Sequence, residues 1–260
     1  MNAIITAGGI PKPEDPLFAY TQGNSKALLD IAGKPMAQWV LDALQKSPKI
    51  HNIVVIGLNE RDGLNASEKV VFLPNQGKML ANIVAGFKKI KEMDPSSERI
   101  IIASSDIPGI TTEMVEWLIN EVEKDPSDIH YGVIKKEVME KRYPDSRRTW
   151  SALKDMEVCG ADISVANYRM ATEHLNTWEE LIGSRKSPFR QAATIGFMTL
   201  ILFVMKKLTL EDAVRRVSES LKIKGKAIVW PWAEAGMDVD KPHQLEILRK
   251  DFAAKSTDRK

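Results

Sequence analysis

In the first half of the chain, short runs of apolar residues alternate with segments in which apolar residues recur every three or four positions. The apolar runs are 3–5, 52–58, 69–73 and 99–103. Continuous runs rich in β-branched residues suit strands that are buried on both faces, as in a parallel sheet. The helical spacing predicts helices over 35–44, 79–90 and from Thr111 or Thr112 to Val122. Strands that alternate with helices predict an α/β protein with a largely parallel sheet.

Beyond Asp125 the alternation is less regular. We expect strands at 128–135, at 147–156 running into 157–163, and at 226–230, with a polar turn at 137–142. We expect helices at 166–171, 177–182, 191–208, 210–221 and 243–254. The apolar stretch from Ile195 to Met205 is too short to cross a bilayer and is interpreted as a buried helix. Residues 256–260 are polar and are expected to fray.

The composition narrows the class of protein. A chain of 260 residues with 43% hydrophobic and 28% charged residues is typical of a soluble globular domain. Its net charge of +2 does not favour a nucleic-acid partner, because nucleic-acid binders concentrate basic residues on one face. The single cysteine, Cys159, cannot form an internal disulfide and fits a cytoplasmic protein. No basic region precedes the first apolar run, so no signal peptide is expected.

The most informative stretch is 1–36. Its first strand stops at Gly8-Gly9, and a polar, proline-rich loop follows, with Lys12 near its start and Lys26 near its end. Glycines let backbone N–H groups approach an anion, because no Cβ blocks the way, and a lysine adds a mobile positive charge for phosphate. The alternative is a tight turn with a surface lysine. The length of the loop argues against it, since long loops in compact domains are usually functional or disordered.

Acidic residues mark two further positions. Asp106 follows the apolar strand 99–103, and in open α/β sheets ligands bind outside the carboxyl ends of strands. Its carboxylate there suits Mg²⁺, which binds one or two carboxylates plus phosphate oxygens; the alternative is a turn or helix cap. Asp238 and Asp240 alternate in an extended stretch, which predicts both carboxylates on one side, sharing a cation with Asp106 if the loops converge. Asp240, which we favour as the ligand, has the alternative of capping the last helix.

These features resemble the nucleotidyltransferase superfamily, which includes sugar-phosphate pyrophosphorylases, isoprenoid cytidylyltransferases and MobA-like molybdenum-cofactor guanylyltransferases. The residues that carry the resemblance are Ala7-Gly8-Gly9, Lys26, Gly33-Lys34-Pro35-Met36, Ser105-Asp106-Ile107-Pro108 and Asp238-Val239-Asp240-Lys241-Pro242. The chain departs from the family at Ile10-Pro11-Lys12-Pro13, where members carry a third glycine and an arginine. The resemblance implies a three-layer α/β/α sandwich with a Rossmann-like, mostly parallel sheet of the nucleotide-diphospho-sugar transferase type. It also implies one domain over 1–255, with a nucleotide-binding half at 1–125 and an acceptor-binding half at 126–255.

The resemblance implies a Mg²⁺-dependent enzyme that moves a nucleoside monophosphate from an NTP to a phosphorylated or acidic small-molecule acceptor, releasing pyrophosphate. Its implied catalytic residues are Lys12, Lys26 and Asp106, and Mg²⁺ would bind Asp106, Asp238 and Asp240. The implied nucleotide-binding residues are Ala7, Gly8, Gly9, Asn75, Gln76, Gly77 and Asn82. Amides both donate and accept, which suits the edge of a nucleobase, although a merely polar loop is equally compatible. Arginines suit a phosphate or carboxylate on the acceptor, and the alternative for each basic group is a solvated charge run. Arg185-Lys186 is favoured over Arg147-Arg148 and Arg190, because it lies between two expected helices, just before Pro188.

Three alternatives stay open. Asp238-Val239-Asp240 has the Asp-x-Asp form of a glycosyltransferase metal site, although it lies at the end of the chain rather than after a mid-chain strand. A dinucleotide-binding dehydrogenase is poorly supported, because the Gly-x-Gly-x-x-Gly spacing is missing. The altered loop at 10–13 favours a non-catalytic nucleotide-binding relative, whereas the retained lysine and aspartates favour an enzyme. The apolar content of 191–221 is compatible with packing against a second copy in a homodimer.

Overall fold

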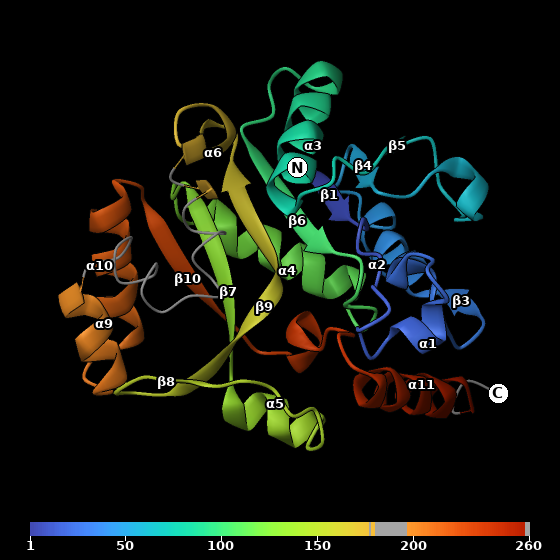
Figure 1. Cartoon of the computed structure of the whole chain (residues 1–260). Helices are drawn as coiled ribbons and strands as arrows, with labels where there is room; N and C mark the ends of the chain where they lie inside the picture. Colours follow the sequence, from blue (N-terminus) through green and yellow to red (C-terminus); the bar gives the residue numbers. More distant parts are fainter. Residues whose placement is uncertain (177, 180–196, 258–260) are drawn as a thin grey trace.

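The computed structural model describes residues 1–176, 178–179 and 197–257. Within these ranges one eight-stranded sheet has the order β10-β7-β9-β6-β1-β4-β5, with β8 paired to β9, and β2 and β3 form a separate hairpin (Figure 1). The strands are β1 Asn2–Thr6, β2 Asp30–Ile31, β3 Lys34–Pro35, β4 Ile53–Ile56, β5 Val70–Leu73, β6 Arg99–Ser104, β7 Ile129–Lys135, β8 Ser151–Ala152, β9 Glu157–Asn167 and β10 Gly225–Trp230.

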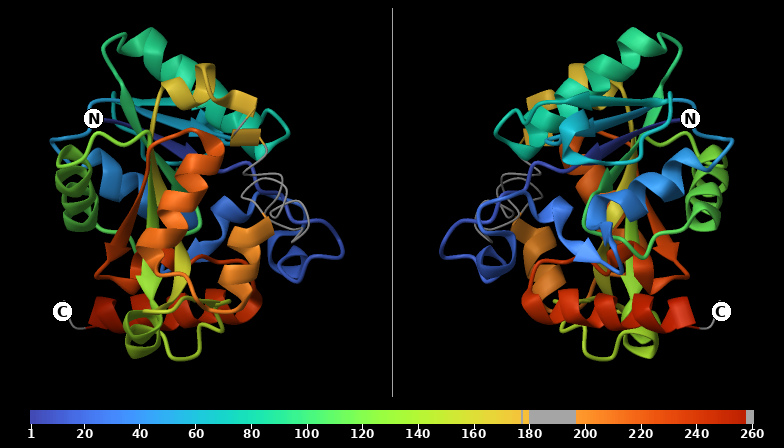
Figure 2. Two further views of the ribbon diagram at one scale, coloured as in Figure 1. Left: turned by 90° about the vertical axis from the view of Figure 1, so that its left-hand side faces the viewer. Right: turned by 90° about the vertical axis from the view of Figure 1, so that its right-hand side faces the viewer.

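Helices cover both faces of this sheet. The α-helices are α1 Phe18–Thr21, α2 Met36–Gln45, α3 Met79–Met93, α4 Thr112–Glu123, α5 Lys136–Arg142, α6 Arg169–Thr172, α9 Phe197–Val204, α10 Leu210–Leu221 and α11 Pro242–Thr257. Short 3₁₀ turns are η1 Lys26–Leu28, η2 Glu60–Asp62 and η3 Ala233–Gly236. In Figure 2, α2 and α4 lie on one side of the sheet and α10 lies on the other. The three-layer α/β/α arrangement predicted above is therefore confirmed.

The apolar runs become strands because each has a core on both faces. In β1, Ala3 and Ile5 pack into the core under α2 and α4, whereas Ile4 packs into the opposite core beneath α3. The neighbouring strand β4 divides in the same way, with Val55 on the first side and Val54 on the second. Side chains alternate between the faces of a strand, so a continuous apolar run is required when both faces are covered.

The topology places the expected ligand position beside β1. The chain runs from β1 to β4 and β5, all parallel, and then returns to β6, which pairs in parallel with the opposite edge of β1. The loops after β1 and β6 therefore leave the sheet at the point where the strand order reverses, which is where open α/β sheets bind ligands. The sheet is mixed rather than wholly parallel, because β9 is antiparallel to both β6 and β7.

Some predictions for the second half were wrong. The expected polar turn at 137–142 is the helix α5, which buries Met139 and was hard to recognise because it shows so little apolar periodicity. The expected long strand from 147 is only the two-residue β8, whereas β9 extends to Asn167 and displaces the start of the helix expected at 166. The helix predicted at 177–182 falls largely outside the described residues, as does the beginning of the one predicted at 191–208.

The apolar helix α9 is not buried as expected. Among its described side chains, Met198 is 61% exposed and Val204 is 71% exposed. Figure 1 shows α9 beside α10, beyond the edge strand β10, so it lies outside the two layers that enclose the sheet. Within the described ranges, no helix combines the length and the hydropathy that crossing a membrane requires.

Candidate active site

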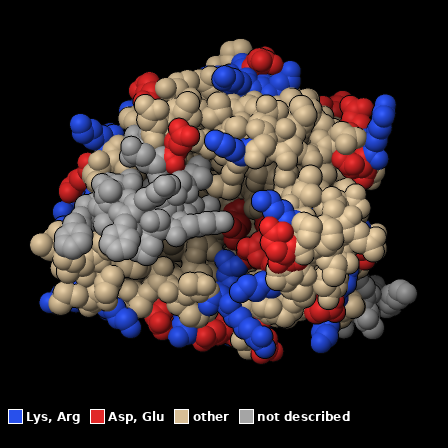
Figure 3. All heavy atoms as spheres, viewed as in Figure 1, with Lys and Arg blue, Asp and Glu red and all other residues tan. Residues whose placement is uncertain are grey.

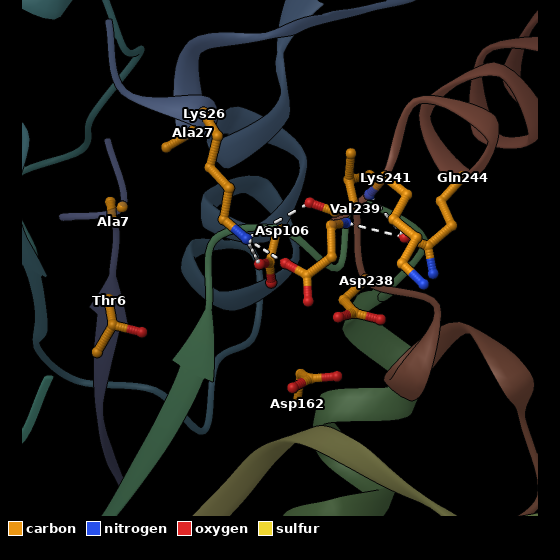
Figure 4. A network of polar contacts seen from close by, with 12 residues as sticks. Thr6, Ala7, Lys26, Ala27, Asp106, Asp162, Asp238, Val239, Lys241 and Gln244 are labelled. Carbon is orange, nitrogen blue, oxygen red and sulfur yellow. Dashed lines mark hydrogen bonds and ion pairs between the residues drawn. The ribbon is translucent and has the colours of Figure 1, made fainter. Parts of the chain in front are cut away.

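One lysine lies between two carboxylates at the expected ligand position. The Nζ atom of Lys26 is 2.6 Å from Oδ2 of Asp106 and 2.7 Å from Oδ1 of Asp240, and it also donates to the backbone oxygen of Val239 at 3.4 Å. Figure 4 shows the side chain of Lys26 reaching toward Asp106 and the backbone of Val239, which come from two other segments of the chain. Three of the residues predicted from sequence are thus brought into direct contact.

The loop after β1 fixes the backbone of Lys26. Its amide donates to the oxygen of Gly9 at 3.0 Å, and the hydroxyl of Ser25 donates to the oxygen of Ala7 at 2.8 Å. The lysine side chain then passes over Gly9, with Cε only 3.3 Å from where a Cβ on that glycine would lie. The absence of a side chain at Gly9 therefore makes room for the lysine, beside the backbone amides expected to hold phosphate.

The closing loop reaches the same point through backbone contacts. Asp106 follows β6, and its backbone oxygen accepts from the amide of Val239 at 3.0 Å. The side chain of Gln244 accepts from the amides of Asp240 and Lys241, so it satisfies the start of α11. Neither aspartate is therefore needed as a helix cap. Gln244 satisfies the amides at the start of α11, in place of Asp240. Thr111 caps α4 by accepting from the amide of Met114, in place of Asp106.

The charges in this cluster reinforce one another. Burial lowers the pKa of Lys26, but the charges of Asp106 and Asp240 outweigh burial and raise this pKa above its ordinary value. Burial raises the pKa of Asp240, but the charge of Lys26 outweighs burial and lowers this pKa below its ordinary value. Asp106 is 7% exposed at its side chain, and its Oδ1 has no hydrogen-bond partner among the described residues. Lys26 is therefore protonated and positively charged. Beside it, Oδ1 of Asp106 is a buried oxygen without a partner among the described residues.

A second cation, which the sequence analysis offered only as a less favoured acceptor contact, lies nearby. Arg148 forms an ion pair with Asp238 through Nη1, and its Nη2 is 3.7 Å from Oδ2 of Asp162 on β9. Asp238 was expected to face the same side as Asp240, but residues 237–240 form an irregular loop rather than a strand, and the two aspartates have different partners. The sequence signal for Arg148 was its place in a basic pair; nothing in the pattern marked Asp162.

Gly57 is a further residue that sequence analysis missed. It has φ +102°, and a Cβ there would lie 2.4 Å from the Cα of Gly8. The two glycines thus allow the backbones after β1 and β4 to touch. A glycine at the end of an apolar strand was the available signal, because close backbone approach is a common reason for glycine in that place.

The predicted base-binding amides form a network among themselves. The side chain of Asn75 donates to the oxygen of Gly8 at 3.0 Å and accepts from the amide of Gly77 and from Nδ2 of Asn82. Asn82, which is buried, accepts from the amide of Gln76 at 2.6 Å. A cavity of about 360 Å³ opens beside this network at the carboxyl ends of β4 and β5. These asparagines therefore shape the loop that borders the cavity.

The remaining predicted residues are not joined to the cluster. Lys12 lies exposed before α1, and no ion pair links it to a carboxylate in the part of the chain that is described. Arg185, Lys186 and Arg190 fall outside the described residues. In the described ranges, no three His, Cys, Asp or Glu side chains gather closely enough to hold a metal ion. Figure 3 shows acidic and basic side chains around a hollow near the middle of this face.

The chain is similar to a known protein family and to solved structures. Residues 3–185 match the model of the MobA-like NTP transferase domain. A hypothetical transferase from Thermus thermophilus superimposes with a TM-score of 0.81 and 27% identity, covering 94% of this chain and 98% of that chain. No curated protein sequence matches at a significant level.

Two more distant structures share the fold. A CMP:2-keto-3-deoxy-manno-octonic acid synthetase complexed with CTP has a TM-score of 0.61 and 15% identity, covering 97% of this chain and 98% of that chain. A 2-C-methyl-D-erythritol 4-phosphate cytidylyltransferase, also from Thermus thermophilus, has a TM-score of 0.55 and 14% identity, covering 96% of this chain and 97% of that chain. At these identities the likeness is evidence of the fold alone.

Proposed function

Because the chain belongs to the MobA-like NTP transferase family, and so is a nucleotidyltransferase acting on a nucleotide, we propose a specific reaction for it. The enzyme transfers a nucleoside monophosphate from an NTP to a phosphorylated or acidic small-molecule acceptor in a Mg²⁺-dependent step. An acceptor oxygen attacks the α-phosphorus, the bond from this phosphorus to the β-phosphate oxygen breaks, and pyrophosphate leaves. The observation that carries this proposal is the contact of Lys26 with Asp106 and Asp240 at the expected ligand position.

The phosphate site is proposed at the loop after β1. The amides of Gly8 and Gly9 and the ammonium of Lys26 would hold the triphosphate and stabilise its charge as the bond to pyrophosphate breaks. Ala7 places this loop at the end of β1, with its amide bound to the oxygen of Ile56 at 2.8 Å. Catalysis then rests on positioning and electrostatics, and no covalent enzyme intermediate is required. Lys12 would join only if its loop closes over the phosphates.

The acidic residues fit a magnesium ion. Asp106 has a buried oxygen without a partner among the described residues, and the exposed Asp240 lies beside the same ammonium. Two carboxylates plus phosphate oxygens are the usual ligands of Mg²⁺ at a nucleotide. When bound there, the ion offsets charge that develops on the phosphates. We propose Asp240 rather than Asp238 as the second ligand, because Arg148 already neutralises Asp238.

The base and acceptor subsites are assigned from position. We propose that the base lies in the cavity beside β4 and β5, which Asn75 lines, with Gln76 and Gly77 next to it on the same loop and Asn82 holding this loop in shape. The acceptor would bind over the second half of the chain. Its anionic group would need a cation other than Arg148, whose charge is engaged by two aspartates, so Arg185-Lys186 is the proposed contact. The cytoplasmic location, the two-half organisation and the homodimer all stay predictions.

The first test is the thermal midpoint of unfolding with each NTP, with and without Mg²⁺. A ligand that binds only the folded state raises the midpoint by mass action. We expect one NTP to stabilise strongly, only with Mg²⁺, and the effect to disappear in Asp106→Asn. Absence of stabilisation by every NTP would contradict the proposed reaction.

Two alternatives are separated by further assays. The exposed Lys12 and the altered loop at 10–13 favour a non-catalytic relative, which would bind the NTP but never release pyrophosphate with any acceptor. A glycosyltransferase would be stabilised by a nucleotide sugar rather than by an NTP. The different partners of Asp238 and Asp240 do not favour this alternative, since an Asp-x-Asp site presents both carboxylates to one metal ion.

A further inference from the structure

We propose that Lys26, in the nucleotide-free protein, occupies the position between Asp106 and Asp240 at which the divalent cation binds. The metal ion can then bind only when the ammonium leaves, and nucleotide phosphates that draw the lysine away open the metal site. This inference rests on the proposed function and adds an order to it: the phosphates must engage the lysine before, or together with, metal binding. Lys26 thereby holds the two carboxylates in place until a nucleotide arrives.

The same pair of carboxylate oxygens would bind either cation. One oxygen of each aspartate lies within 2.7 Å of the same nitrogen. A magnesium ion that binds both oxygens at about 2.1 Å would need to lie close to the present place of that nitrogen. Two cations this close repel each other strongly in a partly buried site. Ammonium and metal ion are therefore mutually exclusive.

An independent observation points to a missing ligand at Asp106. This side chain is 7% exposed, yet its Oδ1 has no partner among the described residues, although Oδ2 binds Lys26. Buried carboxylate oxygens are normally satisfied, and each exception requires an explanation. A lysine that bonds only one oxygen leaves this carboxylate incompletely coordinated, whereas a hydrated metal ion brings water ligands that can satisfy the second oxygen. The lysine is therefore an incomplete substitute for the metal ion.

The lysine can leave without moving the main chain. The amide of Lys26 is bound to the oxygen of Gly9 at 3.0 Å, so its side chain starts beside the proposed phosphate-binding amides. The side chain is 20% exposed and has a long, flexible stem. Rotation of that stem is enough to exchange two carboxylates for phosphate oxygens. Arg148 has no such freedom, because its guanidinium lies between Asp238 and Asp162.

The test measures binding of Mn²⁺ alone, without nucleotide, by the electron paramagnetic resonance signal of the free ion. We expect weak binding to the wild type and an affinity at least about tenfold higher in Lys26→Met, because the competing charge is gone. Lys26→Gln should match Lys26→Met, whereas Lys26→Arg, which keeps a cation, should resemble the wild type. The matched control is Lys34→Met, which removes a lysine paired with Asp42 at 2.9 Å and should leave Mn²⁺ affinity unchanged.

The outcomes divide cleanly. Loss of the gained affinity in Lys26→Met/Asp106→Asn would support the proposal, because it places the gained ion on Asp106. Equal Mn²⁺ affinity in the wild type and in both neutral variants would overturn it. An equal gain in Lys34→Met would also overturn it, since the effect would then be one of net charge. The proposed function fails separately, when no NTP stabilises the wild type, and that result does not alter the metal titration.

Discussion

Two cationic side chains of the candidate site each lie between two aspartates, but their surroundings differ. Lys26 contacts Asp240, whose side chain is 60% exposed, through a single nitrogen on a flexible stem. Arg148 is 14% exposed and pairs with Asp238, which is 9% exposed, through a planar guanidinium. Lysine is a compact, mobile charge, whereas arginine presents donors in a rigid fork. The first arrangement suits an exchangeable contact, and the second suits a permanent one.

This difference separates two aspartates that are adjacent in the sequence pattern. Asp238 and Asp240 are only two residues apart, yet one belongs to the buried arginine cluster and the other to the accessible lysine cluster. Under the proposed function, Asp240 exchanges its partner during the reaction, and Asp238 keeps its partner to hold the closing loop. Substitutions at the two cations should therefore affect different properties of the protein.

The largest expected effect is that of Lys26→Met on catalysis. Loss of a cation that stabilises the transferring phosphates should lower kcat/KM by roughly 10³-fold. The change also leaves the buried Asp106 without its counter-ion, so a loss of stability is expected beside the loss of rate. Pyrophosphate release with the stabilising NTP and an acceptor measures the rate, with Lys34→Met as the control. A rate within twofold of the wild type would contradict the catalytic role that distinguishes Lys26 from Arg148.

Arg148→Met should act on stability instead. It leaves Asp238 buried without its counter-ion, and breaking a buried pair in this way costs about 3 kcal/mol. Denaturant unfolding measures the change. The double variant Arg148→Met/Asp238→Asn should recover much of the loss, since it no longer buries a lone charge. An unchanged free energy of unfolding in the single variant would show that this cluster is not a fixed support.

Substituting Asp240 and Asp238 one at a time should separate a loss of metal binding from a loss of stability. Asp240→Asn should raise about tenfold the Mg²⁺ concentration that gives half of the stabilisation by NTP, because a neutral amide is a poorer ligand for a hard cation. Asp238→Asn should retain this stabilisation while lowering the free energy of unfolding. The midpoint of unfolding as a function of Mg²⁺ concentration, at fixed NTP, distinguishes the two. The reverse pattern would assign the metal ligand to Asp238.

The smallest expected effect is the change with pH in the stability that the ion pair of Lys26 and Asp240 contributes. The folded-state pKa of Asp240 is lowered from the ordinary 3.8, chiefly by the charge of Lys26 acting against burial. Its contribution to stability is therefore fully present above that value and is lost as the pH falls through the lowered pKa. The folded-state pKa of Lys26 is raised above 10.5, so its contribution is lost only as the pH rises beyond that value.

The measurement compares unfolding free energies of the wild type and Asp240→Asn across pH. The difference between them should be constant from about pH 5 to pH 9 and shrink below about pH 4. A difference that grows as the pH falls would contradict the ion pair.

Where apolar runs were continuous, the sequence predicted the structure well. Strands β1, β4 and β6 follow this rule because both of their faces are covered, and Asp106 was placed correctly at the end of β6. The convergence of Lys26, Asp106 and Asp240 could be anticipated from motif positions together with the topology of a parallel sheet. The contact between Gly57 and Gly8 could not, since it depends on how closely two adjacent loops approach.

The second half was harder to predict for physical reasons. β9 is inserted antiparallel between β6 and β7, so its partners are set by tertiary pairing rather than by a local pattern. Arg148 pairs with Asp162 on this strand. The basic pair at 147–148 was a weak local signal for the arginine, and no local feature distinguished Asp162 from surface charge. α9 has the composition of a buried helix, but its place beyond the edge of the sheet leaves Met198 exposed.

The central claim is that Lys26, Asp106 and Asp240 form the site of nucleotidyl transfer. The most direct measurement is a crystal structure with Mg²⁺ and the α,β-methylene analogue of the NTP that stabilises the protein most, since this analogue cannot be cleaved between the α- and β-phosphates. We predict the ammonium of Lys26 on phosphate oxygens and the metal ion bound by Asp106 and Asp240. A nucleotide bound elsewhere, with Lys26 still on both carboxylates, would contradict the account.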